Sequence, residues 1–493
     1  TVLPGCVPYN PFGFGTNSAN RAAVEDFIFG SSIYDTTNKT DDFLLSLAGE
    51  PFSTWAGPVG LAVSAEYRRN SLELTSNSDP QIALDTTGIR GLTTLGVNNR
   101  FNITNIGIAD GTNNAKEAAV ELSVPLANQD SAIGELIVSG AGRWTDYSTS
   151  GTVYTWKGGA TWQPVPDIRL RATRSRDIRA PNLFELFAGR TSQRIPLVDP
   201  HTNFGNPVGA FVFGGGNSDL TPEKADTFTA GVVLSPRFIP RLTFSVDYYN
   251  LKISDAITSL TAGQVLQACE NSNGTGPSCD NIERPLPFAD RTPANFPTSV
   301  FAGFINAATL ETEGIDIEAT YSVPLGNGTL GFRALANHLI RYASQNSESD
   351  PLVSQAGYFD YTLATGTIQP KWRGTLSANY KSDGGLGLFV QARYIGELKM
   401  GEIPGLSVTG RQTNVFDVKT TAAVVYFDAN ISQTIQNGPL GSELELFANV
   451  NNLFNKQPPI IPGPTTLGAL YPTYMPLYDV MGRYFTFGAK IKF

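Results

Sequence analysis

Charge, histidine and cysteine are scarce in this 493-residue sequence, and their scarcity excludes several classes of protein. Lys, Arg, Asp and Glu make up only 16% of the residues, and the formal net charge is −9. No basic block occurs, so nucleic acid is not expected as a partner. Two histidines and three cysteines leave few ligands for a His/Cys metal site. We therefore predict neither a metal site nor a cofactor.

Long apolar runs are missing as well. No stretch of about 18 apolar residues occurs, which excludes a conventional transmembrane helix. The mean hydropathy is −0.11, whereas glycine (49 residues) and aromatic side chains (11%) are abundant. A transmembrane β-barrel combines these properties, because its lipid-facing and lumen-facing residues alternate and cancel in the average.

Alternation of apolar and polar residues is the main positive signal. The apolar face of the last predicted strand consists of Phe485, Phe487, Ala489, Ile491 and Phe493. Each apolar face is nearly free of charge over about nine or ten residues, the length that a tilted strand needs to cross hydrocarbon. Similar patterns predict about 15 strands, near residues 38–50, 57–69, 115–125, 132–147, 152–164, 167–178, 222–235, 240–254, 305–322, 328–342, 370–382, 385–398, 422–435, 441–454 and 480–493.

The connections between these strands alternate strictly in length. Short connections such as QPVPD and KSDGG alternate with long ones, and the link near residues 147–152 is the one short member of the long series. Outer-membrane barrels place short turns in the periplasm and long loops outside the cell. A soluble sheet has the same alternation of residues but no reason for this parity. We therefore predict an all-β fold, a transmembrane antiparallel β-barrel.

Parity also assigns a direction to each strand. The last strand runs from outside to the periplasm, and an odd number of strands makes the first one run the same way. Residues 1–37 are then expected to be the remnant of an extracellular loop, and residues 38–493 the C-terminal part of the barrel. Large plugged transporters have about 22 strands. We therefore expect about seven strands and a plug domain upstream of Thr1.

Several segments resemble TonB-dependent outer-membrane receptors. RDIRAPNLFELF at 176–187 is similar to the family's FRAP…ELF stretch, and DLTPEKAD at 219–226 to its L-x-PE motif. NAATLETEGIDIE at 306–318 resembles its N…GxE strand, and NVNNLFN at 449–455 its NLFD region. The ending TFGAKIKF resembles the signal read by the barrel-assembly machinery. The elements of this assembly signal are Thr486, Gly488, Ile491 and Phe493.

The resemblance implies an active transporter for a scarce solute, such as a ferric siderophore, cobalamin or an oligosaccharide. Its expected partners are the TonB–ExbB–ExbD energy-coupling complex, the plug and remaining strands, outer-membrane lipids and a small-molecule ligand. A passive porin or channel is the alternative, because it has the same strands and terminal signal. A soluble all-β binding protein and an enzyme are more distant alternatives, and no catalytic residue is predicted.

Candidate ligand contacts lie in the long connections. Arg190, Arg194 and His201 share one connection, which suits either an anionic ligand or a solvated loop face. Exposed aromatic rings stack on sugars or hold a siderophore, whereas rings that pack on one another only shape a loop. The aromatic candidates in two further connections are Tyr358, Phe359, Tyr361, Tyr471 and Tyr474.

A disulfide between Cys269 and Cys279 is also predicted. The two cysteines bracket the short, polar, turn-rich span CENSNGTGPSC, which suits a disulfide that closes a surface loop. Two free thiols are the alternative. Cys6 is left over, and its partner is expected upstream of Thr1.

Overall fold

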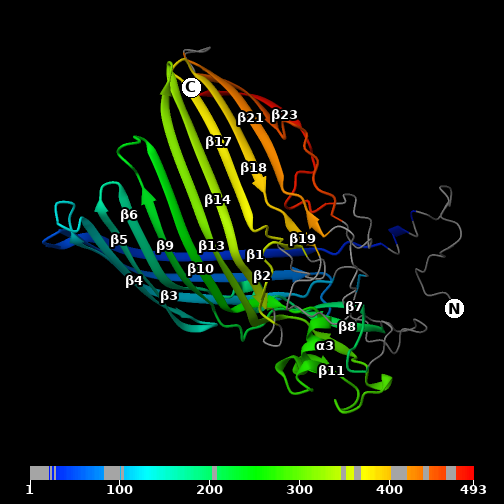
Figure 1. Ribbon diagram of the computed structural model, residues 1–493. Helices are drawn as coiled ribbons and strands as arrows, with labels where there is room; N and C mark the ends of the chain where they lie inside the picture. Colours follow the sequence, from blue (N-terminus) through cyan, green and yellow to red (C-terminus); the bar gives the residue numbers. More distant parts are fainter. Residues whose placement is uncertain are drawn as a thin grey trace.

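The computed structural model of the chain describes residues 22, 25–26, 29–82, 100–101, 105–202, 208–345, 351–359, 368–400, 419–436, 443–461 and 473–492. Its main feature is one large antiparallel sheet (Figure 1). Fifteen strands follow one another in the order β1-β2-β3-β4-β5-β6-β9-β10-β13-β14-β17-β18-β21-β22-β23, and the short β15 (Val353–Ser354) pairs with β14 off this path. All 15 predicted strands are therefore present, and the all-β prediction is confirmed.

Seven of the fifteen strands, β1, β2, β3, β5, β10, β13 and β14, are longer than their predicted ranges. Their bounds are β1 Tyr34–Thr54, β2 Gly57–Ser76, β3 Ala109–Ala127, β4 Glu135–Tyr147, β5 Gly151–Val165, β6 Ile168–Arg179, β9 Glu223–Leu234, β10 Leu242–Ser259, β13 Phe304–Leu325, β14 Gly328–Gln345, β17 Trp372–Ser382, β18 Leu386–Ile395, β21 Val424–Ile435, β22 Glu443–Asn451 and β23 Tyr484–Lys492. The first strand begins before residue 38, because polar residues such as Asp35 still pair with β2, opposite Thr75. Backbone pairing thus continues where the alternation of apolar residues has stopped.

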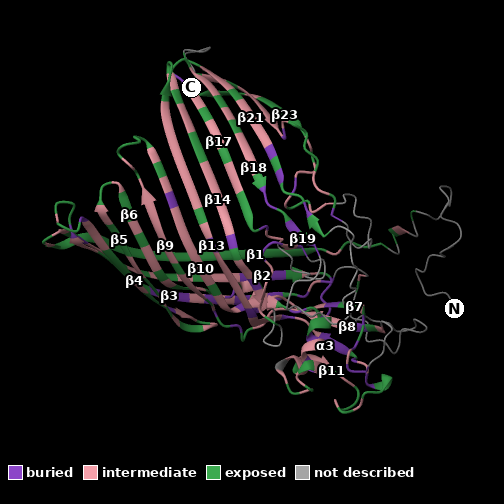
Figure 2. Ribbon diagram, in the orientation of Figure 1, coloured by how far each residue is buried: buried purple, intermediate pink, exposed green. Residues whose placement is uncertain are grey.

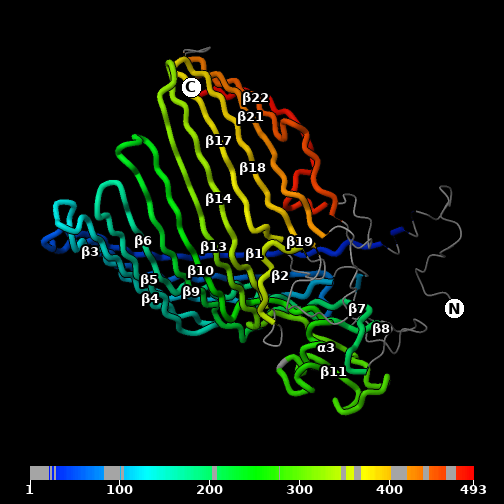
Figure 3. Tube along the Cα trace, viewed as in Figure 1, coloured from blue at the N-terminus to red at the C-terminus, as the bar shows by residue number. Residues whose placement is uncertain are grey.

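The sheet is strongly curved (Figures 1 and 3), and its two faces differ in chemistry. Side chains from β6, β10, β13, β14, β17 and β18 line one hollow of about 540 Å³, which includes Arg171, Asp247 and Arg393. Because these strands are not all neighbours, they can share a hollow only on the concave side. The charged face is therefore the inner face of the curve.

The outer face is apolar and exposed. Its large side chains include Leu122, Val138, Leu376, Leu388 and Ile431, all exposed to solvent in the isolated chain. Buried residues gather instead where the long connections pack, toward the ends of the strands (Figure 2). A continuous exposed apolar surface of this kind indicates contact with a membrane or with another protein. Strands whose residues alternate between an apolar outer face and a polar inner face are typical of a membrane barrel.

The long connections carry structure that the sequence did not predict. A four-stranded sheet consists of β7 (Thr191–Leu197), β8 (Val208–Gly214), β12 (Ser299–Phe301) and β11 (Ile282–Glu283). A three-stranded sheet consists of β16 (Tyr358–Phe359), β19 (Leu398–Met400) and β20 (Thr420–Thr421). The helical elements are α2 (Leu183–Phe187), α3 (Ala262–Asn271), η1 (Pro277–Asn281) and η2 (Pro293–Asn295).

Helix α2 links two distant parts of the sheet. It follows β6, but it packs against β2 and β3, where Leu183 contacts the cluster of Leu72, Leu74 and Ala109. Phe187 lies against Gly111 on the inner face of β3, where a larger residue would collide with the ring. The intervening strands β4 and β5 are joined by a tight turn, so no long loop obstructs the helix. The short connection between β4 and β5, near residues 147–152, thus leaves space for α2.

Candidate ligand-binding site

Two long connections, which follow β6 and β10, fold together into one unit. We call it the loop module and define it by residues 190–202, 208–214 and 262–301. In Figure 1 its elements β7, β8, α3 and β11 lie together beyond one end of the large sheet. Its core consists of buried apolar side chains, which include Leu197, Ala210, Leu266 and Val300. Strand β12 also pairs in parallel with β8, which joins the two connections through their backbones.

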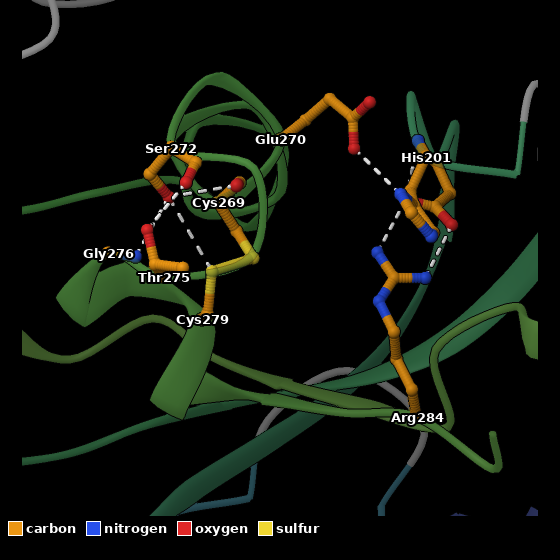
Figure 4. Close-up of a disulfide and its surroundings, with 9 residues drawn as sticks. His201, Cys269, Glu270, Ser272, Thr275, Gly276, Cys279 and Arg284 are labelled. Carbon is orange, nitrogen blue, oxygen red and sulfur yellow. Dashed lines mark hydrogen bonds and ion pairs between the residues drawn. A yellow bond between two sulfur atoms is a disulfide. The ribbon is translucent and has the colours of Figure 1, made fainter. Parts of the chain in front are cut away.

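A disulfide and a helix cap hold one side of the loop module. Helix α3 begins at a capping box formed by Thr261 and Gln264, which satisfies two amides at its first turn. Near its other end, Cys269 is bonded to Cys279 in η1, with their Cα atoms 4.8 Å apart (Figure 4). The predicted disulfide is therefore present, and it ties the end of α3 to the turn that follows.

A buried ion pair joins the two connections. Arg284 donates two hydrogen bonds to Asp199, at 2.7 and 2.9 Å, and a third to the carbonyl of Asn295 at 3.0 Å. The two side chains are only 7% and 0% exposed. Burial by itself raises the pKa of the Asp199 carboxyl, but the hydrogen bonds and positive charge of Arg284 outweigh this effect and leave the pKa below its ordinary value.

His201 lies inside the loop module and not on its surface. Its side chain is 1% exposed and stacks on Phe288, with ring centroids 4.0 Å apart. Its Nδ1 lies 2.7 Å from Oε2 of Glu270, and its Nε2 lies 3.2 Å from the carbonyl oxygen of Asp290 (Figure 4). The sequence grouped His201 with Arg190 and Arg194, but the structure separates it from them. His201 instead connects two segments inside the loop module through its contacts with Glu270 and Asp290.

Glu270 is the second carboxylate in this network. Arg291 donates a hydrogen bond to its Oε1 at 2.7 Å. Partial burial raises the pKa of Glu270, whereas the hydrogen bonds to His201 and Arg291 lower it, and the net result is a pKa below the ordinary value. Both carboxylates are thus held in their charged form at neutral pH.

Arg190 and Arg194 lie on the exposed side of the β7–β8 pair, each against an aromatic ring. The Cζ atom of Arg190 is 3.9 Å from the centroid of Phe213, and that of Arg194 is 5.9 Å from Phe211. The two rings are stacked, with centroids 6.3 Å apart. Within the described residues, no carboxylate pairs with either arginine. A guanidinium that uses its face on a ring keeps its N–H edge for an anion.

The aromatic candidates form a separate cluster. Phe359 is buried with residues of β18, β19 and β21, and Tyr474 packs on it edge to face, with centroids 6.0 Å apart. Tyr358 is half-buried, with the Nζ atom of Lys399 5.7 Å from its ring centroid. Tyr361 and Tyr471 lie outside the described residues. The structure thus brings Phe359 and Tyr474 together in a cluster between connections, and both Tyr358 and Tyr474 are partly open to solvent.

Charged side chains on the inner face of the large sheet pair across strands. Glu117 accepts from Arg68 at 2.9 Å and from Arg143 at 3.1 Å, beside a hollow of about 370 Å³. Arg171 pairs with Asp247 at 2.6 and 2.8 Å. Such pairing keeps charges stable in a confined polar lumen, where a lone charge would be costly.

Two site features were missed in the sequence. Phe211 and Phe213 alternate in the segment AFVFG, so a strand with both rings on one face was readable there. The pair of Asp199 and Arg284 had no signal in the sequence, because 85 positions separate the two residues.

In the described part of the chain, no group of three or more His, Cys, Asp or Glu residues could hold a metal ion, and no helix is long and apolar enough to cross a membrane.

A family model described as TonB dependent receptor-like, beta-barrel, matches residues 8–453. The chain belongs to this family. The resemblance carried by the sequence motifs is thereby confirmed, and so is the location in the outer membrane of a Gram-negative bacterium. The apolar wall of the TonB-dependent receptor barrel therefore faces the lipid.

Solved TonB-dependent receptors share the fold at low sequence identity. The siderophore receptor PirA from Acinetobacter baumannii is 14% identical, with a TM-score of 0.58 over 93% of this chain and 55% of that one. A variant of the ferric enterobactin receptor PfeA from Pseudomonas aeruginosa, in complex with enterobactin, is 14% identical, with a TM-score of 0.59 over 93% and 55%. This chain therefore spans about half the length of these receptors. No curated protein matches it in sequence.

Proposed function

We propose that the protein takes up a scarce anionic solute across the outer membrane by energy-coupled transport, with a ferric siderophore as the ligand class. The observation that carries this proposal is the pair Arg190 and Arg194, both exposed on the loop module and both without a carboxylate partner in the described residues. Family membership and the siderophore receptors with the same fold support it. Cobalamin and oligosaccharides are the competing ligand classes.

The arginine pair favours an anion over a neutral ligand. Both guanidinium groups stand against rings that limit their motion, so less conformational entropy is lost when a ligand binds. Hydrogen bonds between charged partners contribute about 1.5–3 kcal/mol each. An oligosaccharide offers hydroxyl groups and ring faces but no charge, so it would gain less from these two residues.

The energy for transport is proposed to come from the TonB–ExbB–ExbD complex, which would act through a plug inside the barrel. The inner face supports this, because its paired arginines and carboxylates offer hydrogen-bonding groups to a polar protein filling. A passive channel would need no such coupling. Collapse of the proton-motive force should therefore abolish uptake, and continued uptake by de-energised cells would refute the coupled mechanism.

Uptake of labelled ferric siderophores by cells that produce the full-length protein tests the ligand assignment. The double variant Arg190→Gln/Arg194→Gln should raise the half-saturating concentration about tenfold or more, because charge-assisted contacts are lost. Gln193→Ala is the matched control, since Gln193 is exposed on β7 and lies between the two arginines in the sequence. Equal loss in both variants, or unchanged uptake in the double variant, would exclude the arginine pair as the ligand contact.

A further inference from the structure

The outer face of the barrel has a ring of aromatic side chains toward the loop-bearing ends of its strands. Such rings mark the boundary between hydrocarbon and lipid headgroups. From β4 onward its members include Trp144, Tyr154, Trp156, Phe228, Tyr248, Trp372 and Tyr394. Strand β6 lies between Trp156 on β5 and Phe228 on β9, and at this height it has two arginines in place of an aromatic residue.

Strand pairing places both arginines on the lipid-facing side. Arg176 is directly opposite Trp156, and Arg174 is directly opposite Phe228. Directly paired residues of an antiparallel sheet point to the same side. Arg171, three positions earlier than Arg174, points to the other side and pairs with Asp247 in the inner hollow.

The two arginines differ in their partners. Arg176 forms two hydrogen bonds with Asp226, at 2.9 and 3.0 Å. Arg174 is exposed, and within the described residues it forms no ion pair with a carboxylate, although the charge of Asp226, its diagonal neighbour on β9, attracts it. Its neighbour on the other side is Gly158, where even an added Cβ would meet nothing within 4 Å. The N–H edge of Arg174 is therefore open toward the membrane.

Asp226 accepts both of its hydrogen bonds from Arg176, so the N–H groups of Arg174 can still bind a further anion. A lone cation is costly in hydrocarbon, and the cost falls toward the headgroup region. A phosphate group matches the fork of an arginine in charge and geometry, because two N–H groups can donate to two phosphate oxygens. The flanking Trp156 and Phe228 offer the mixed polar and apolar contacts that suit the boundary between headgroup and acyl chain.

We propose that Arg174, with Arg176 beside it, binds the phosphate of a phosphorylated lipid headgroup in the outer leaflet of the membrane. The site lies on the outer wall of β5, β6 and β9, and it is separate from the loop module and from the lumen. A lipid held there would fix the height of this wall in the membrane and would stay bound during purification.

Native mass spectrometry of the full-length protein, purified from outer membranes in detergent, tests this site. The probes are lipid A with its phosphates and the same lipid after dephosphorylation. The wild-type protein should bind the phosphorylated form about tenfold more tightly, as expected for one charge-assisted bidentate contact. Arg174→Gln should remove this preference, and Arg174→Lys should retain part of it, because the charge remains without the fork.

Arg169→Gln is the matched control. Arg169 is on the same strand but faces inward, where it donates to Gln163 at 3.1 Å, so this variant should keep the wild-type preference. Equal binding of both lipid forms by the wild-type protein would overturn the proposal, whether or not any variant folds. It would also fail if Arg169→Gln lost the preference as Arg174→Gln does, or if inorganic phosphate displaced the lipid at equal concentration.

Discussion

Replacing Arg284 with methionine would leave the Asp199 carboxylate buried inside the loop module without its ionic partner. Asp199 would keep hydrogen bonds from the Thr202 hydroxyl, at 3.0 Å, and from the His201 backbone amide, at 3.3 Å, but would lose both bonds from the guanidinium. Breaking a buried pair by removing one partner costs about 3–5 kcal/mol. The Nε atom of Arg284 is buried and has no hydrogen-bond partner among the described residues. This lowers the net stabilisation by the native pair, so we expect about 3 kcal/mol, the lower end of that range.

Hydrogen exchange of the α3 amides measures this loss, because local opening of the module exposes them. Arg284→Met should accelerate their exchange about 100-fold, as expected for about 3 kcal/mol, while amides of β13 and β14 stay protected. Arg291→Met is the control. Arg291 also pairs with a carboxylate at 2.7 Å, but its side chain is 57% exposed, so its loss should cost no more than about 1 kcal/mol.

The double variant Asp199→Asn/Arg284→Met separates the ion pair from general packing. With the buried charge removed as well, much of the stability should return, because the uncompensated carboxylate causes most of the loss. If Arg284→Met and Arg291→Met had equal effects, or if the double variant were the least stable, the buried pair would not hold the module as we infer.

Three further results are expected. The Asp199 and Glu270 carboxyls have pKa values below their ordinary 3.8 and 4.5, so their stabilisation of the loop module is present above about pH 4.5 and is lost as the pH falls through the lowered values; α3 amides should exchange faster at pH 3 than the pH dependence of intrinsic exchange explains. Cys269→Ser/Cys279→Ser should cost the module about 2–3 kcal/mol, seen as faster proteolysis within residues 262–301 while the barrel still migrates in its folded, heat-sensitive form. Arg179→Met should free α2, because Arg179 bridges Glu185 at 2.9 Å and Glu223 at 2.7 Å, and cleavage near residues 183–190 should increase without loss of membrane insertion.

The strands were predictable because their environment imposes a simple rule. A wall with lipid on one side and polar surroundings on the other forces side chains to alternate, and pairs such as Leu61↔Leu122 and Ala65↔Ala118 show this alternation in register. The rule does not apply where both faces of a strand are in water. The polar extensions of long strands such as β1, β2 and β3 were therefore not predicted. The same rule places Arg174 and Arg176 on the face with Leu170 and Ala172, yet their height at the aromatic ring needed the pairing with β5 and β9.

The loop module was not predictable, because its contacts join distant parts of the chain. His201 looked like a surface residue, since its partners Glu270 and Asp290 are 69 and 89 positions away. The disulfide was an exception, because its cysteines are only 10 positions apart and close a local turn. Arg190 and Arg194 were recognised by residue type, but the rings that support them come from β8.

The construction of the loop module from two connections has a consequence for how its specificity can be altered. The hairpin of β9 and β10 separates the two segments along the chain, yet β12 pairs with β8 and Arg284 reaches Asp199 across the divide. Exchanging either connection alone with that of another receptor would leave a buried charge and an unpaired strand edge. A chimera that transplants both segments as one graft should keep its fold and acquire the donor's recognition surface.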